Sequence, residues 1–329
     1  MKTIGIMAIL LGLVLLAGCS TVVDTTPEEP EQQRINLVVT NVGFNPIYYP
    51  LDEGKIPMPE NIDVKLVKTS YNQAELYTLS TKGTPTVGVL SGVNIAMAYN
   101  EGQEYRILAP YYREIVGPKG FSVGQVVALK DSDINSPKDF EGKKIGIQGE
   151  SDGSTLIMKT VLEKVYQVDL TKIEFIGIDS ENAPALLEKG SLDAAMFDSD
   201  FIIASDFDAK YKTALDFGKE MQEFYGVVPP AKFFVARADE YAKNPQLYDE
   251  AVFYFKQNYL WSVNNLEEIT RLEADESGDD YSFLLEKADY EKRLDSLSDA
   301  DKFAWKAIWE TAVSEGVLSS VPEIDSIFG

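Results

Sequence analysis

Two aspartates, Asp198 and Asp200, stand two positions apart directly after an apolar segment, 194–197. Paired carboxylates can exchange protons with a bound molecule or accept hydrogen bonds from it. Aspartate is also a common helix cap, and one of the two would then cap the short segment 201–205 that follows. We favour capping or ligand hydrogen bonding over catalysis, because aspartates occur so often as caps.

Histidine is absent from the chain, and Cys19 is its single cysteine. Ser-His-Asp and Cys-His catalysis are thereby excluded in their usual forms. Imidazole ligands are excluded too, and one thiol cannot make a zinc site, so we expect neither a metal nor a cofactor. The small-residue loop 149–155 lacks the Gly-Lys-Ser/Thr sequence of a nucleotide-binding P-loop.

The loop 149–155, GESDGST, suggests ligand binding instead. It joins a short apolar strand to a helix whose apolar side chains recur at helical spacing. Ser154 or Thr155 is predicted to cap this helix, so that the N–H groups of the first turn face the loop and bind an anion or a polar ligand head. A plain turn is the alternative, and we favour binding because a strand end and a helix start coincide here. The predicted binding residues are Ser151, Gly153, Ser154 and Thr155.

Strands and helices alternate on both sides of this loop. The order of elements in the first half of the chain recurs in the second half, which predicts two related lobes, each a mixed, mostly parallel sheet flanked by helices. Ligands bind at the carboxyl ends of parallel strands, so we expect a cleft between the lobes. The predicted strands are 35–40, 63–67 and 86–90 in the first lobe and 144–147, 173–177 and 194–197 in the second.

The first lobe must supply the other wall of the cleft. Its strand-end turns are predicted at 42–46 and 91–92. Aromatic side chains near a cleft suit stacking on a planar ligand ring, although core packing explains them equally well. The remaining candidate ligand residues are Phe44, Asn45, Tyr48, Ser91, Gly92, Tyr112 and, from the second lobe, Asp198.

The N-terminal residues 1–19 contain an early lysine and an apolar run that is too short for a comfortable membrane span, which is typical of a secretion signal. They end in Leu-Ala-Gly-Cys, which resembles the lipobox of bacterial lipoproteins. That resemblance implies cleavage before Cys19 and lipidation of its thiol; an ordinary signal peptide with an incidental cysteine is the alternative. The polar residues 20–33 contain two prolines and are predicted to be a flexible tether. We therefore expect an extracytoplasmic protein that is anchored to the membrane by lipid.

The composition fits a two-lobed soluble body. Of the 329 residues 45% are hydrophobic, enough for two modest domains, and the net charge of −23 argues against nucleic-acid binding. Two proline-containing segments, 107–116 and 225–234, would carry the chain between the lobes as stiff crossings with a small hinge. The predicted division is lobe 1 over 34–113, lobe 2 over 114–235, and a return to lobe 1 with C-terminal helices over 236–329.

Four phrases resemble one known family in their order along the chain. They are 43–51 (GFNPIYYPL), 136–147 (SPKDFEGKKIGI), 186–195 (LLEKGSLDAA) and 237–248 (RADEYAKNPQLY). The family comprises the solute-binding proteins of ABC importers for nitrate, sulfonates, taurine and thiamine-pyrimidine precursors. The resemblance implies the type II periplasmic-binding-protein fold, in which two α/β lobes close on a ligand.

The resemblance also implies a function. We expect the extracytoplasmic solute-binding component of an ABC importer, which binds a small organic acid or heteroaromatic solute, sulfonate-like or thiamine-precursor-like, by hinge closure. The expected partners are this ligand, a membrane permease and the lipid anchor, and we expect a monomer that performs no covalent chemistry. A ligand-binding sensor component for a membrane signalling partner and an exported enzyme on the same fold are the two alternatives.

Overall fold

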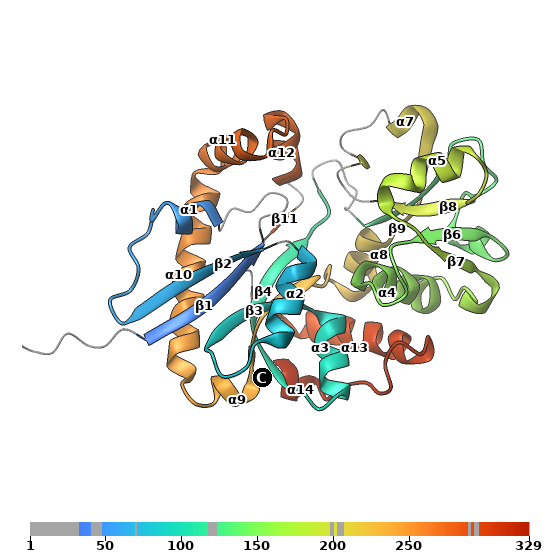
Figure 1. Cartoon of the computed structure of the whole chain (residues 1–329). Helices are drawn as coiled ribbons and strands as arrows, with labels where there is room; N and C mark the ends of the chain where they lie inside the picture. The colour runs from blue at the N-terminus through green and yellow to red at the C-terminus, as the bar shows by residue number, and fades with distance from the viewer. Residues whose placement is uncertain are drawn as a thin grey trace, which may run out of the picture. The chain divides into compact units, whose positions relative to one another are not determined.

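Two β-sheets, each flanked by helices, organise the chain (Figure 1). The structure is a computed structural model, and everything described below belongs to one compact unit, Gln32–Gly329. No helix among the described residues is both long enough and apolar enough to span a membrane. The structure describes residues 33–40, 48–69, 71–117, 124–197, 201–202, 207–288, 291–292 and 296–328.

The first sheet has the strand order β11-β4-β10-β3-β1-β2. β1, β2 and β3 are parallel neighbours, whereas β10 runs antiparallel between β3 and β4. β10 therefore returns from late in the sequence to a central position, where five of its six residues are buried. The strands are β1 (Gln33–Thr40), β2 (Ile62–Thr69), β3 (Thr86–Ser91), β4 (Tyr105–Glu114), β10 (Lys232–Arg237) and β11 (Glu291–Lys292).

The second sheet has the order β7-β6-β8-β5-β9. Its parallel core of β7, β6 and β8 is extended by β5, which pairs antiparallel with both β8 and β9. All four residues of β8 are buried, as expected for a short strand in the middle of a sheet. The strands are β5 (Gln125–Leu129), β6 (Lys144–Ile147), β7 (Glu174–Gly177), β8 (Ala194–Phe197) and β9 (Tyr211–Asp216).

Local sequence signals mark the start of some of the helices. In α10 (Pro245–Asn264), for example, Pro245 opens the helix and the Asn244 side chain accepts from Leu247 N. The other helices that follow first-sheet strands are α1 (Tyr48–Asp52), α2 (Tyr71–Ser80), α3 (Gly92–Asn100), α9 (Ala238–Tyr241), α11 (Leu266–Ser277), α12 (Tyr281–Ala288), α13 (Asp299–Ser314) and α14 (Ile324–Phe328). Those of the second sheet are α4 (Gly153–Thr160), continued by a π-helix (Val161–Val165), α5 (Ala183–Glu188), α7 (Phe207–Lys210) and α8 (Phe217–Tyr225).

Helix α13 contacts elements of both sheets. Trp305 and Trp309 on its inner face are fully buried, and Trp309 Nε1 donates to Gly92 O at the start of α3, 3.0 Å away. On the second-sheet side, Thr311 Oγ1 donates to Glu163 Oε2 at 3.1 Å. The tryptophans therefore pack α13 against α3.

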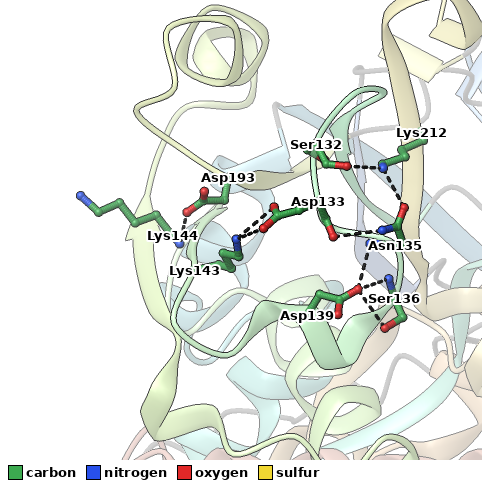
Figure 2. Close-up of polar contacts among 9 residues, drawn as sticks. All are labelled: Ser132, Asp133, Asn135, Ser136, Asp139, Lys143, Lys144, Asp193 and Lys212. Atoms are coloured by element: carbon green, nitrogen blue, oxygen red, sulfur yellow. Dashed lines mark hydrogen bonds and ion pairs between the residues drawn. The ribbon is translucent and has the colours of Figure 1, made fainter.

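The family-like phrase 136–147 forms a hydrogen-bonded scaffold in the second sheet (Figure 2). Asp139 Oδ2 accepts from the backbone N of Asn135 and of Ser136, both at 2.9 Å, and so caps the 3₁₀ turn Pro137–Phe140. Lys144 N at the start of β6 donates to Asp193 Oδ2 at 2.8 Å. Asp193 belongs to the other family-like phrase of this sheet, so the two phrases hold adjacent strands together.

One of the two predicted crossings between the lobes lies inside a sheet. The segment 107–116, predicted as a crossing between lobes, is largely part of β4 inside the first sheet, because its buried positions pair with β10. Pro110 falls between two register shifts in β10, where a strand tolerates a residue that lacks an N–H group. The lobe limits 34–113, 114–235 and 236–329 stay a prediction.

Candidate functional site

Ser91 ends β3 and caps α3. Its Oγ accepts from Asn94 N at 3.1 Å, which satisfies one of the free N–H groups at the start of the helix. Its own backbone N donates to Glu75 Oε1 at 2.5 Å, and Asn94 Nδ2 donates to Glu75 Oε2 at 2.8 Å. Glu75 on α2 therefore fixes the junction between β3 and α3 with both carboxylate oxygens.

Lys232 lies beside this junction, at the first position of β10. It stands in register with Ser91 on one neighbouring strand and with Tyr112 on the other, so the three form a row across the sheet. The Lys232 Nζ is 3.6 Å from Glu75 Oε1, and only 10% of the lysine side chain is exposed. A largely buried ion pair thus lies at the strand ends of the first sheet, beside the predicted site residues Ser91 and Tyr112.

The electrostatics of Lys232 connect the two sheets. Burial lowers the pKa of this lysine, while the negative charges of Glu75 and Asp152 act in the opposite direction. Asp152 lies in the loop 149–155, which follows strand β6 of the second sheet. Its negative charge acts on the Lys232 ammonium of the first sheet.

The start of α4 differs from the prediction in its cap. The cap is Asp152, whose Oδ1 accepts from Thr155 N at 2.9 Å, and not Ser154 or Thr155. Asp152 has the extended backbone of a cap residue, whereas Thr155 already lies inside the first turn and is fully buried, its Oγ1 3.5 Å from Met196 Sδ. A carboxylate now offsets the positive end of the helix, so the helix start alone is a poor anion site.

The two glycines predicted for the site have different surroundings. A Cβ atom on Gly92 would lie 2.3 Å from the Trp305 ring, so this glycine permits the close packing of α13. A Cβ atom on Gly153 would meet nothing within 4 Å, so this position faces open space. Next to Gly153, Ser151 is exposed and Ser154 is half-buried. Of the predicted loop residues, Gly153, Ser151 and Ser154 are at least partly exposed to solvent.

For several predicted site residues the structure describes no side chain. Phe44, Asn45, Asp198 and Cys19 lie outside the described residues, as does Asp200. Tyr48 and Tyr112 are described through their backbones, in α1 and β4. Their roles in binding or lipidation stay predictions.

Sequence reasoning missed Glu75 and Lys232. Lys232 could have been found from the sequence, because it begins the otherwise apolar segment KFFVA. A strand of this kind is buried in the sheet, and here its first residue is buried as well. Glu75 gave no comparable signal, since acidic residues on amphipathic helices usually face solvent.

Within the described ranges, no group of three or more His, Cys, Asp or Glu side chains is arranged to hold a metal ion. One cavity lies at the opposite end of β10, beside Thr86, Tyr105 and Arg237. Another, open to solvent, lies along the junction of α10 and α11. Neither cavity is lined by a predicted site residue.

Known structures share this arrangement of two sheets. The periplasmic aliphatic sulphonate binding protein SsuA from Escherichia coli is 15% identical, with a TM-score of 0.67, and the match covers 91% of this chain and 92% of that one. A periplasmic sulfonate-binding protein SsuA from Methylobacillus flagellatus is 18% identical, with a TM-score of 0.64 and coverage of 92% of both chains. The alkanesulfonate-binding protein SsuA from Xanthomonas axonopodis pv. citri, bound to MOPS, is 16% identical, with a TM-score of 0.61 and coverage of 92% and 99%.

These similarities define the class of fold, the two-lobed periplasmic-binding fold that the sequence predicted. No curated protein matches the chain by sequence. The model of the NMT1/THI5-like family matches residues 58–267, about two thirds of the 329 residues. The chain belongs to the NMT1/THI5-like family.

Proposed function

We propose that this chain is the extracytoplasmic solute-binding component of an ABC importer. Family membership and a fold shared with proteins named as periplasmic sulfonate-binding proteins support this role. The single observation that carries it is the buried Lys232–Glu75 pair, which lies at the strand ends of the first sheet and feels the Asp152 charge from the second. We infer that the polar end of a ligand binds beside this ammonium and carboxylate.

The ligand proposed is a small organic acid or heteroaromatic solute, sulfonate-like or thiamine-precursor-like. The Lys232 ammonium would attract its acid group, and Ser91 and the accessible serines of the loop 149–155 would donate hydrogen bonds. Glu75 and Asp152 place two negative charges against one positive charge, which favours a ligand with a single negative charge over a dianion. Phe44, Tyr48 and Tyr112 would contact an aromatic ring.

Binding would proceed by closure of one lobe on the other, without covalent chemistry. The sequence has no histidine to act as a general base, and its one cysteine stands at the proposed lipidation position. Cys19 would carry the lipid, residues 20–33 would form the tether, and a membrane permease would receive the solute from a monomeric binding protein.

A ligand screen tests this proposal. Thermal unfolding and calorimetry with ethanesulfonate, MOPS, benzoate and an aminopyrimidine should reveal one class that raises the melting temperature with one-to-one reversible binding. Lys232→Met should weaken binding of an anionic ligand at least tenfold, whereas Lys210→Met, which alters an exposed ion pair of the second sheet, should not. Conversion of a probe into product would support an enzyme instead, and the absence of any binding together with capture of a signalling receptor would support a sensor.

Membrane attachment has a separate test. Full-length protein expressed in a bacterium with a lipoprotein pathway should fractionate with membranes, and Cys19→Ala should release it. Equal membrane association of both forms would contradict lipid anchoring while leaving solute binding unaffected.

A further inference from the structure

Lys159 on α4 has almost no access to solvent. Only 1% of its side chain is exposed, although α4 begins at the candidate ligand loop 149–155. Removing an ammonium from water is costly unless opposite charges accompany it. A lysine at this depth therefore needs partners, and those partners say what it does.

Two carboxylates and an aromatic ring contact the Lys159 ammonium. Its Nζ donates to Glu315 Oε2 at 2.7 Å, at the C-terminal cap of α13, and to Glu150 Oε2 in the loop. The Nζ also lies 4.4 Å from the centre of the Phe175 ring on β7, and an aromatic face attracts a cation. One buried ammonium thus joins the loop to the end of α13.

The two carboxylates have different surroundings. The Glu315 side chain is 22% exposed and ends α13, a helix that the buried Trp305 and Trp309 hold in place. The Glu150 side chain is 60% exposed and belongs to a loop. Lys159 would keep Glu315 as a counter-charge if Glu150 left. The main consequence of the Glu150 contact therefore falls on the loop and not on the lysine.

Packing does little to fix the first part of the loop 149–155. A Cβ atom on either glycine of the loop would meet no atom within 4 Å, and glycine permits many backbone conformations. Local hydrogen bonds hold the later part, because Asp152 N donates to Gly149 O at 3.2 Å and Asp152 Oδ1 accepts from Thr155 N at 2.9 Å. The contact of Glu150 with Lys159 joins the start of the loop to the buried body of the helix.

We propose that Lys159 is a positioning residue of the ligand site, which holds Glu150 and thereby keeps the loop 149–155 in the shape that binds the solute. This inference rests on the proposed function, since the loop is a binding element only if a solute uses Ser151 and Ser154. Lys159 acts through Glu150 and does not contact the ligand, because its ammonium is buried and hydrogen-bonded to two carboxylates.

Hydrogen exchange of the ligand-free protein tests whether Lys159 holds the loop. Glu150→Ala should raise the exchange rates of the amides of 151–155 by about fivefold, because the loop then loses a charge-assisted hydrogen bond. Glu315→Ala is the matched control, since it removes the other carboxylate of the same lysine. It should lower the melting temperature at least as much as Glu150→Ala does and leave loop exchange unchanged, because Glu315 lies outside the loop.

A double variant assigns the effect on exchange to the lysine. In Lys159→Met protein, Glu150→Ala should produce no further increase in loop exchange, because the partner of Glu150 is already gone. Loop exchange in Glu150→Ala that equals that of the wild type overturns the proposal. So does an equal increase in Glu315→Ala, which would show only a general loss of stability.

Ligand affinity tests whether the held shape is the one that binds. Calorimetry uses ethanesulfonate, or whichever of the four screened probes binds the wild type. Glu150→Gln retains an oxygen that accepts from Lys159, whereas Glu150→Ala does not, and both remove the same charge. Glu150→Ala should therefore bind the probe about fivefold more weakly than Glu150→Gln, because its loop must be ordered on binding.

Failure of this inference differs from failure of the proposed function. Equal affinities of Glu150→Ala and Glu150→Gln beside tight binding by the wild type would overturn the role of Lys159 and leave solute binding intact. If none of the four probes binds the wild type, the importer proposal fails and the ligand role of Lys159 fails with it. The exchange measurement, made without ligand, still decides whether Lys159 holds the loop.

Discussion

Arg113 and Asp301 form a buried, two-pronged ion pair, with Nη1 2.5 Å from Oδ1 and Nη2 3.2 Å from Oδ2. The two side chains are 6% and 0% exposed. Arg113 Nη1 also donates to Val228 O at 2.7 Å. Arg113 is the next-to-last residue of β4, Val228 precedes β10, and Asp301 lies in the first turn of α13. One guanidinium therefore joins α13 to both segments by which the chain leaves and re-enters the first sheet.

Arg113→Met should lower the free energy of unfolding by about 3–5 kcal/mol, because it leaves the Asp301 carboxylate buried without its counter-charge. Urea denaturation measures the loss. The double variant Arg113→Met with Asp301→Asn should recover part of it, since the unpaired charge is then removed. A loss in the double variant equal to the sum of the two single losses would contradict this account of the pair.

Gly92→Ala should destabilise the protein by about 1–3 kcal/mol, because the new methyl group overlaps the Trp305 ring. Gly153→Ala is the matched control, since its methyl group meets no atom and the substitution restricts the unfolded chain; it should leave stability equal or raise it by about 0.4–1 kcal/mol. Thermal unfolding compares the two. If Gly153→Ala nevertheless abolishes ligand binding, Gly153 lines the ligand site.

Asp152→Asn should tighten the binding of an anionic probe such as ethanesulfonate by roughly fivefold, the equivalent of about 1 kcal/mol of screened charge–charge energy. The negative charge of Asp152 repels an anion that binds near Lys232, and the substitution removes this charge. Asparagine caps a helix as well as aspartate does, so α4 keeps its cap. Calorimetry of both forms gives the ratio. Weaker binding after the substitution would show that the ligand presents a cationic or N–H group to this carboxylate.

The second sheet should lose stability in acid. Hydrogen bonds from the backbone of Asn135 and Ser136 hold the pKa of Asp139 below its usual range, and the Lys143 ammonium does the same for Asp133. A carboxylate whose pKa is lower in the folded state stabilises it fully above the unfolded pKa of about 3.9 and loses that effect as the pH falls through the folded value. Protection factors for hydrogen exchange across 130–145, corrected for the intrinsic exchange rate at each pH, should therefore fall below about pH 4.

The Asp139→Asn variant separates these two carboxylates (Figure 2). It should flatten the pH dependence that comes from the backbone hydrogen bonds. Added salt should weaken the contribution of the Lys143–Asp133 pair, because both ends of that pair reach solvent. An unchanged pH dependence in the variant would show that Asp139 does not control it.

The sequence predicted the short parallel strands well, because each is a local apolar run. β6 and β8 have the predicted limits, 144–147 and 194–197. A strand whose position in the sheet depends on partners that are distant in the sequence was not predicted. β10 is central because it pairs with β3 and β4, and nothing local to 232–237 reveals those partners.

The candidate site also contains residues that the local sequence reveals and residues that it does not. The loop 149–155 could be found from a strand end beside a helix start, and Ser91 from the end of another strand. Lys232 and Glu75 meet only through strand register and helix packing, which depend on the whole sheet. The cap at Asp152 was misassigned because the sequence offers three adjacent capping side chains, Asp152, Ser154 and Thr155, and only the backbone geometry selects one.

The late arrival of β10 and α13 sets the order in which a nascent chain can fold. The first sheet needs residues 232–237 between its early strands, and the tryptophans of α13 complete its core. The second sheet, whose strands all lie between Gln125 and Asp216, has its full set much earlier. All strands of the second sheet are therefore synthesised before β10, a central strand of the first sheet. The strands β1 to β4 therefore cannot complete their sheet until residues 232–237 have been synthesised.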